Sequence, residues 1–173
     1  ALAHPVRHID CMEIAPEVVD AARLFDDVHG AAPANPRVEM RAEDGRNFLL
    51  RAPGRYGLIL SDIVHPDHAG AGNLYTVEHF RLCRDRLAEN GRMAQWLPLS
   101  QLSEAEVRSV ILGFTRVFPH ATAWFGDLYA LSPTLLLLGS TAPQTFRPAD
   151  LDALLTPALA ADLPAAGDGA GLI

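Results

Sequence analysis

The sequence predicts an α/β fold, with a doubly wound, mostly parallel sheet that ends in an antiparallel hairpin. Apolar segments of strand length alternate with amphipathic helical segments through the first hundred residues, an order typical of a parallel sheet covered by helices on both faces. Two strand-like segments then follow each other without a helix between them. We expect one domain over residues 1–145, and a C-terminal helix with a loose Ala/Gly-rich tail over residues 146–173.

The first half of the chain supplies three of the expected strands. Strands are expected at residues 6–14, 37–42 and 56–61, and helices at residues 16–25, around 48–50 and at 76–89. Pro16 suits the first turn of a helix, and Thr76 suits an N-cap. Asn90-Gly91 predicts a helix end, and residues 26–36 are predicted to form a loop. The strand at 56–61 is continuous enough in apolar residues to be buried on both faces.

The second half adds the last strands. A strand is expected at residues 92–97, where Pro98 stops it. Ser103 and Glu106 have the spacing of a capping box, which predicts the start of an amphipathic helix. The final elements are expected to be an antiparallel pair of strands at 121–125 and 134–139 and a short helix at 148–155.

Composition excludes several classes of function. The net charge is -7, all 14 basic residues are Arg, and none of them form a basic run, so nucleic acid is not an expected partner. The absence of Lys excludes a lysine Schiff base or a lysine general base. No apolar stretch is long enough to span a bilayer, and residues 1–5 do not resemble a signal peptide. Cys11 and Cys83 lie in apolar patterns and predict buried free thiols in a reducing cytoplasm.

One expected feature is missing from the start of the chain. A nucleotide-binding α/β domain usually begins with a strand and a glycine-rich turn. The first residues, Ala1 to Pro5, contain no such cluster, and the chain opens on what reads as the segment before a second strand. We therefore expect either that the natural protein has further sequence upstream or that this is a truncated form.

Three carboxylates follow three successive predicted strands. Glu13, Asp44 and Asp62 would therefore line one edge of a parallel sheet, where ligands bind in α/β folds. Glu13 has the place of an acid that accepts hydrogen bonds from ribose hydroxyls. Asp44 could accept from an exocyclic amine, while Gly45 lets a flat base approach the backbone. Each acid taken alone also suits a surface position or a turn, and the conjunction is the more specific signal.

The loop after the third strand is rich in His and Asp. Asp62, His65, Asp67 and His68 form the string Asp-x-x-His-x-Asp-His, and His79 lies on the next helix. Such side chains can bind zinc or iron, but metal sites usually gather ligands from separate elements. We therefore expect no metal here and regard the loop as a segment that could close over a substrate.

Further along the chain, Tyr75, Gln95 and Trp96 are expected to flank the same edge of the sheet. Gln95-Trp96 ends a predicted strand, so these side chains either line a pocket or form an aromatic plug of the core.

Taken in order, these motifs resemble those of the spermidine synthase family of polyamine aminopropyltransferases. The matching segments are Met12-Glu13-Ile14, Glu43-Asp44-Gly45-Arg46, Tyr56 to Asp62 with Pro66, and Leu74-Tyr75-Thr76. The resemblance covers about residues 6–125. Gln95-Trp96-Leu97-Pro98 is more similar to the spermidine-synthase-like domains that are fused to membrane transporter-like segments.

The resemblance implies a Rossmann-like, S-adenosylmethionine-type fold without its first strand and glycine-rich turn. It also implies that Glu13 holds the ribose and Asp44 the adenine of decarboxylated S-adenosylmethionine, and that Asp62 is the base on the attacking amine. The remaining residues that it assigns are Ile14, Gly45 and Ala71 on the donor side and His65, Tyr75 and Gln95 on the amine side.

This chain departs from the family pattern at several points. His65 stands where the family has a second Asp that helps to bind the cationic polyamine, and Ala15 replaces an Asp. The glycine-rich motif and the small N-terminal β domain of the family are absent from residues 1–173. The exchange of Asp for His65 affects which amine is accepted, and the absence of the glycine-rich motif and the N-terminal β domain affects how tightly the donor binds.

The sequence thus predicts a transferase that moves an aminopropyl group from decarboxylated S-adenosylmethionine to a small-molecule amine without a metal. Two alternatives stay open: a non-catalytic nucleoside-binding or regulatory domain of the same fold, and a methyltransferase with another acceptor. We expect a cytoplasmic location, either alone or as the cytoplasmic domain of a longer membrane-attached protein, with no direct membrane insertion of this segment. A homodimer stays open.

Overall fold

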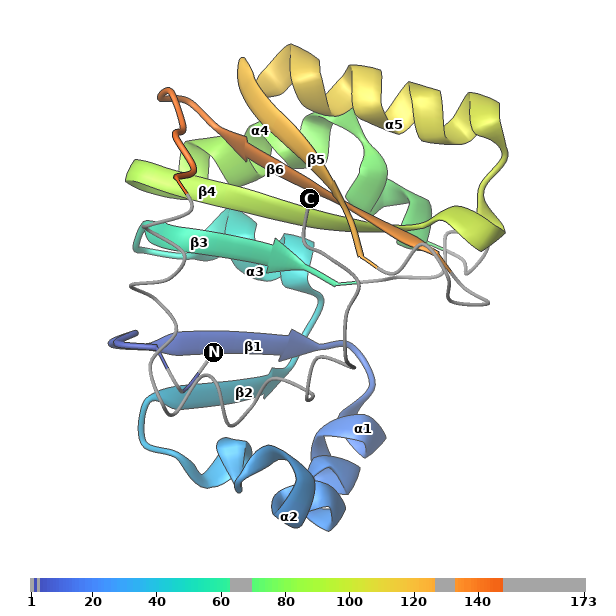
Figure 1. Ribbon diagram of the computed structural model, residues 1–173. Helices are drawn as coiled ribbons and strands as arrows, with labels where there is room; N and C mark the ends of the chain where they lie inside the picture. Colours follow the sequence, from blue (N-terminus) through green and yellow to red (C-terminus); the bar gives the residue numbers. More distant parts are fainter. Residues whose placement is uncertain (1, 3, 63–69, 127–132, 148–173) are drawn as a thin grey trace. The chain divides into compact units, whose positions relative to one another are not determined.

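The computed structural model describes residues 2, 4–62, 70–126 and 133–147 (Figure 1). These residues belong to two compact units, Ala1–Glu43 with Thr145–Ile173, and Asp44–Gln144. The helix predicted at 148–155 and the tail lie outside the described residues. None of the helices in the described part is long and apolar enough to cross a bilayer.

The first unit pairs two parallel strands. Its elements are β1 (Ile9–Glu13), α1 (Pro16–Ala21), a 3₁₀ turn (Ala22–Phe25), α2 (Asp26–His29), a second 3₁₀ turn (Ala32–Ala34) and β2 (Val38–Ala42). The strands run in register from Ile9 opposite Val38 to Glu13 opposite Ala42. Pro16 begins α1, as predicted.

Two predictions in this unit were wrong in their bounds. β1 begins at Ile9 rather than at residue 6, because pairing starts where the Ile9 N–H donates to the Arg37 carbonyl at 2.8 Å. The segment 26–36, predicted as a loop, contains α2 and a 3₁₀ turn. Gly30 and Ala31, with φ of 62° and 52°, take the left-handed conformation that ends α2.

The second unit is a four-stranded sheet with three helices. Its strands are β3 (Tyr56–Ser61), β4 (Leu87–Pro98), β5 (His120–Phe125) and β6 (Thr134–Ser140), and its helices are α3 (Gly45–Arg51), α4 (Val77–Arg86) and α5 (Glu104–Val117). The strand order is β3-β4-β6-β5, with β3 and β4 parallel and the other pairs antiparallel. The terminal hairpin predicted at 121–125 and 134–139 is therefore confirmed.

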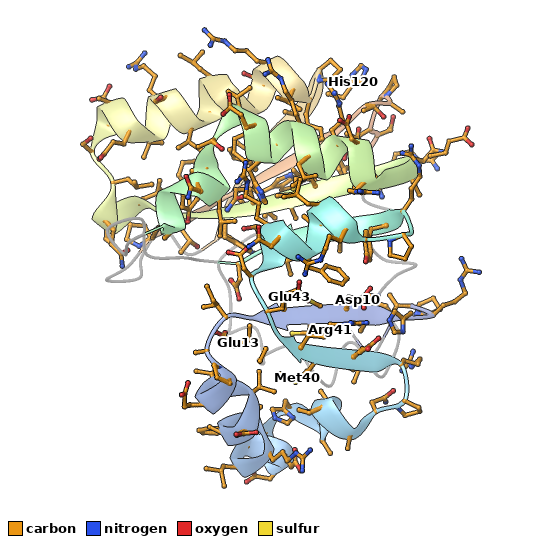
Figure 2. The ribbon with its side chains drawn as sticks, turned by 180° about the vertical axis from the view of Figure 1, so that it is seen from behind. Asp10, Glu13, Met40, Arg41, Glu43 and His120 are labelled. Carbon is orange, nitrogen blue, oxygen red and sulfur yellow. The ribbon has the colours of Figure 1, made fainter. Side chains whose placement is uncertain are left out.

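The core of this unit lies between the sheet and its helices, which cover one face of the sheet (Figures 1 and 2). Phe80 of α4 and Phe114 of α5 meet edge to face with ring centroids 5.1 Å apart, and Phe118 lies 4.8 Å from Phe114. On β3, Leu58 and Leu60 point away from these helices and are 56% and 58% exposed. The expectation that this strand is buried on both faces was wrong, because α3, α4 and α5 all lie on one side.

The predicted helix end at Asn90-Gly91 was also wrong. The helix α4 ends at Arg86, and Asn90 and Gly91 lie in a bulge of β4. Tyr56 pairs with Leu87 and Leu58 with Arg92, so the register shifts between them. Asn90 has a left-handed φ of 60°. A Cβ on Gly91 would lie 2.8 Å from the Tyr56 carbonyl oxygen, so the strand can approach only if this residue is glycine.

Other local predictions were confirmed or corrected at single residues. Thr76 caps α4 by accepting a hydrogen bond from the His79 N–H, and Ser103 with Glu106 forms a complete capping box on α5. Cys83 is buried, as expected, but Cys11 is exposed. Its apolar neighbours Ile9 and Met12 are themselves only half-buried, so the apolar pattern around Cys11 did not indicate a covered strand.

Candidate active site

Glu13 ends β1 and also begins the next helix. Its Oε1 accepts a hydrogen bond from the Ala15 N–H at 2.9 Å. Ala15 is the N-cap position of α1, and its side chain cannot accept from the amides of the first turn. The Glu13 carboxylate satisfies a different donor, the backbone N–H of Ala15 itself. The hydrogen bond fixes one carboxylate oxygen, and a carboxylate has a second oxygen that can accept from a ligand hydroxyl.

Asp44 is the N-cap of α3. Its Oδ1 accepts from the Asn47 N–H at 2.6 Å, and Gly45 is the first helical residue. The alternative interpretation of Asp44-Gly45 as a simple turn is therefore replaced by a helix start. The backbone amides of Gly45 and its neighbours lie at the N-terminus of α3, which is the positive end of the helix dipole.

The pairing of β3 with β4 determines where Asp62 and Gln95 lie in the sheet. Ser61, the last residue of β3, lies in register with Gln95, and Asp62 follows directly as an exposed residue. Gln95 is fully buried, and its Nε2 donates to the Trp96 carbonyl at 3.1 Å. Its Oε1 has no hydrogen-bond partner among the described residues. A buried acceptor in that state is costly in free energy unless a donor from water or a ligand reaches it.

The start of α4 holds a histidine that the sequence indicated only as a distant metal ligand. His79 is buried, and burial, with a smaller contribution from Arg46, lowers its pKa to about 4, although Asp44 acts in the opposite direction. The imidazole is thus neutral at pH 7. Arg46 and Asp44 belong to the start of α3, and α3 contacts α4. This long-range proximity left no signal in the sequence.

Several buried polar atoms of this unit have no hydrogen-bond partner within the described part of the chain. Among the described residues they are Arg46 Nε, His79 Nδ1 and Gln95 Oε1. Tyr75 and Ala71, which belong to the 3₁₀ turn before α4, are buried as well. Tyr75 is part of the core cluster, and its contact with a ligand stays a prediction.

The structure thus places some of the predicted site residues and leaves others open. Asp62 follows the strand that pairs with Gln95, and Asp44 lies within electrostatic reach of His79. Glu13 and Ile14 belong to the other unit, so a common edge for the three carboxylates stays a prediction. Ile14 is 71% exposed. His65, like the rest of the segment 63–69, lies outside the described residues.

Comparison with known sequences gives a consistent result. Residues 2–125 match the family described as the spermine/spermidine synthase domain. The polyamine aminopropyltransferase of Nitrosomonas europaea is 28% identical over 152 residues, which cover 83% of this chain and 45% of that protein. Polyamine aminopropyltransferase 2 of Pseudomonas aeruginosa is 36% identical over 92 residues, 51% of this chain and 26% of that protein. The chain thus spans less than half the length of these curated relatives.

Solved structures confirm the fold class. A spermidine synthase in complex with the transition state analogue AdoDATO superposes with a TM-score of 0.79 at 20% identity, covering 90% of this chain and 55% of that one. Human methyltransferase-like protein 13 in complex with SAH gives a TM-score of 0.65 at 18% identity, covering 96% of this chain and 76% of that one. At such identities the likeness shows the fold alone, which is the predicted Rossmann-like, S-adenosylmethionine-type α/β fold.

Proposed function

Because this chain belongs to the spermine/spermidine synthase domain family, we propose that it is the donor- and amine-binding part of an aminopropyltransferase. The donor is decarboxylated S-adenosylmethionine and the acceptor is a small-molecule amine. The observation that carries the proposal is the place of Asp62. It is an exposed carboxylate directly after β3, where Ser61 pairs with the buried Gln95 of β4. Ligands of open α/β sheets bind at the carboxyl ends of the strands.

The reaction needs a neutral amine, because an ammonium group has no lone pair. The amine nitrogen attacks the aminopropyl carbon that is bonded to the sulfonium sulfur. A C–N bond forms, the C–S bond breaks, and its electron pair leaves with sulfur as neutral methylthioadenosine. The proton lost by the nitrogen passes to the Asp62 carboxylate, whose negative charge also favours the cation that develops on nitrogen.

The donor side of the proposal rests on two carboxylates with defined local geometry. Glu13 would accept hydrogen bonds from the ribose, because the Ala15 amide engages only its Oε1. Asp44, at the start of α3, would accept from the adenine amine, with Gly45 leaving room for the base. Ile14 and Ala71 are proposed to contact the nucleoside. No glycine-rich turn precedes β1 in these residues, so we expect weak donor binding by the chain as it stands.

On the amine side, His65 is proposed to set the specificity, with Gln95 and Tyr75 as further contacts. The family holds a cationic polyamine with carboxylates, and His65 removes one negative charge from that set. Loss of a charge-assisted hydrogen bond typically costs about 1.5–3 kcal/mol, on the order of tenfold to a hundredfold in affinity. We therefore expect little or no transfer to putrescine, and a gain in the His65→Asp variant.

Transfer assays test the role of Asp62 and of His65 separately. Aminopropyl transfer is measured with a panel of amines for the wild type, Asp62→Asn and His65→Asp, with Asp85→Asn as the matched control. Asp85 is an exposed carboxylate of α4 that pairs with Arg84 at 2.8 Å. We expect Asp62→Asn to abolish transfer and Asp85→Asn to leave it unchanged. Transfer that survives in Asp62→Asn excludes Asp62 as the base, and robust wild-type turnover of putrescine that His65→Asp does not change refutes the charge argument.

Calorimetry tests the donor site independently of turnover. Methylthioadenosine is titrated into the wild type, Glu13→Gln and Asp44→Asn. Each variant keeps an acceptor oxygen for its helix start but loses the charge, so each should bind about tenfold or more weakly. Binding without transfer would support the non-catalytic nucleoside-binding alternative. Absence of binding to this chain and also to any longer form of the protein would refute the proposal.

The wider setting of the reaction is also proposed from the family. We expect the enzyme to act in the cytoplasm, on a free amine and not on nucleic acid, without a catalytic metal. The Gln95-Trp96-Leu97-Pro98 motif suggests that this domain is attached to a transporter-like membrane segment, and the sequence of the complete gene tests this hypothesis. Assembly as a homodimer is a second hypothesis, which light scattering tests.

A further inference from the structure

We propose that His8, Asp10 and Glu39 form a binding site for a divalent transition metal of the Zn²⁺ type, with ligands that are not among the residues of the candidate active site. Within the described residues they are the group whose His and carboxylate ligand atoms all lie within 4.8 Å of one another. The site lies where β1 and β2 begin, whereas Glu13 ends β1 at the opposite end of the strand.

The pairing of the two strands explains why the three side chains meet. Asp10 and Glu39 are register partners in the parallel ladder, so their side chains point to the same face. His8 precedes Asp10 by two residues, the spacing that returns a side chain to the same face of an extended segment. The ligands therefore come from two segments that are far apart in sequence, as they do in protein metal sites rather than in a single acidic loop.

The distances suit a tetrahedral ion. His8 Nε2 lies 3.2 Å from Asp10 Oδ1 and 3.8 Å from Glu39 Oε2. Two ligands that are each about 2.0–2.1 Å from a tetrahedral Zn²⁺ are about 3.4 Å apart. The two observed distances bracket this value, and the ligand oxygens of Asp10 and Glu39 lie within 4.8 Å of each other, so side-chain rotations would be needed to bring all three atoms onto one ion. Water would complete the coordination, because the side chains of His8 and Glu39 are about half exposed.

A neighbouring residue orients one ligand. Arg41 donates to Glu39 Oε1 at 2.7 Å, and the other oxygen of that carboxylate, Oε2, faces His8. A hydrogen bond to the outer oxygen of a ligating carboxylate is a typical outer-shell contact of metal sites. Figure 2 labels Asp10 and Arg41 on the two strands. The competing interpretation of the cluster is an ion pair in which a protonated His8 bridges the two carboxylates without any metal.

Metal titration separates the two interpretations. Zn²⁺ is titrated calorimetrically into the full 173-residue chain, and Co²⁺ is added as a spectroscopic probe of tetrahedral geometry. The variants are His8→Gln, Asp10→Asn and Glu39→Gln, all at partly exposed positions, with circular dichroism as the check on folding. The control is the double variant His65→Ala/His68→Ala, which removes the histidines of the loop motif.

We expect one Zn²⁺ per chain. Each ligand variant should lose at least about tenfold in affinity, the lower end of what an outer-shell change costs. The loop control should bind as the wild type does. Three outcomes overturn the proposal: no stoichiometric binding, binding that the three variants do not weaken, or binding that is lost in the loop control.

Discussion

His79 and Cys83 lie one turn apart on α4, with the imidazole Nε2 3.4 Å from the thiol Sγ. Both side chains are buried, and burial raises the pKa of the thiol to about 12 while it lowers the pKa of the imidazole to about 4. At neutral pH the pair is therefore an uncharged contact inside the core. An ionised group at either position would lack compensation in an apolar environment.

The pH dependence of stability should report on His79. Its pKa is about 4 in the folded protein and about 6.5 in the unfolded chain, so between these values the unfolded chain takes up a proton that the folded protein does not. The free energy of unfolding should fall as the pH decreases from 6.5 to 4, by up to about 3 kcal/mol. Urea unfolding of wild type and His79→Phe measures this. The difference between them should vanish or reverse at low pH, and a constant difference between wild type and His79→Phe would contradict the prediction.

The two cysteines should differ in reactivity. Cys11 is exposed, although partial burial and the nearby Glu13 raise its pKa, whereas Cys83 is fully buried. Because the thiolate is the reactive form, we expect slow labelling at Cys11 alone in the native protein and at both sites in denaturant. Intact-mass measurement after maleimide treatment checks this. The Cys11→Ser variant should remain unlabelled when native, and rapid labelling of that variant would show that Cys83 is accessible.

Gly139 should tolerate no side chain. A Cβ there would lie 2.6 Å from Phe114 Cε1 and 2.7 Å from Phe118 Cγ, both ring atoms of the packed core. Gly139→Ala should therefore lower the free energy of unfolding by about 1–3 kcal/mol, as overpacking does. Gly57→Ala is the matched control on β3, where a Cβ meets nothing within 4 Å, and it should be neutral or slightly stabilising. Equal effects of the two substitutions in urea unfolding would be the contrary result.

The contribution of the α5 capping box to stability should be measurable by comparing two Ser→Ala substitutions in this helix. Ser103 accepts from the Glu106 N–H, and Glu106 Oε2 accepts from the Ser103 N–H at 2.8 Å. Ser103→Ala should cost about 1 kcal/mol in unfolding free energy. Ser109→Ala, an exposed position inside the same helix, should instead be slightly stabilising because Ala is the better helix former. Hydrogen bonds from Ser103 lower the pKa of Glu106, so the box should weaken as the pH falls through that lowered pKa.

How far the sequence predicts this structure depends on the range of the interactions involved. Ser103, Glu106 and Thr76 act within one helical turn, so their caps could be read directly from their spacing. The bulge at Asn90-Gly91 could not, because it arises from the pairing of β4 with Tyr56, more than thirty positions away. The same dipeptide is a helix end in one context and a strand bulge in another.

The candidate site shows the same division. The positions of Glu13, Asp44 and Asp62 at the ends of successive strands followed from the strand pattern. The burial of His79 near Arg46 did not, because it depends on how α3 and α4 pack. The Glu13–Ala15 contact is local and could have been found, since the backbone N–H of an N-cap residue needs a nearby acceptor and Glu13 is two residues away.

That contact gives Glu13 a structural role beside its proposed role in donor binding. The structural role is to accept the hydrogen bond from the backbone amide of Ala15, where α1 begins. If the proposed ribose contact holds, a substitution at this position would alter ligand preference and the start of α1 in a single step. An Asp or Ser at position 15 would accept from amides in the first turn of α1, but its own backbone N–H would still need the Glu13 carboxylate. The start of α1 would therefore depend on Glu13 whichever of these residues stood at position 15.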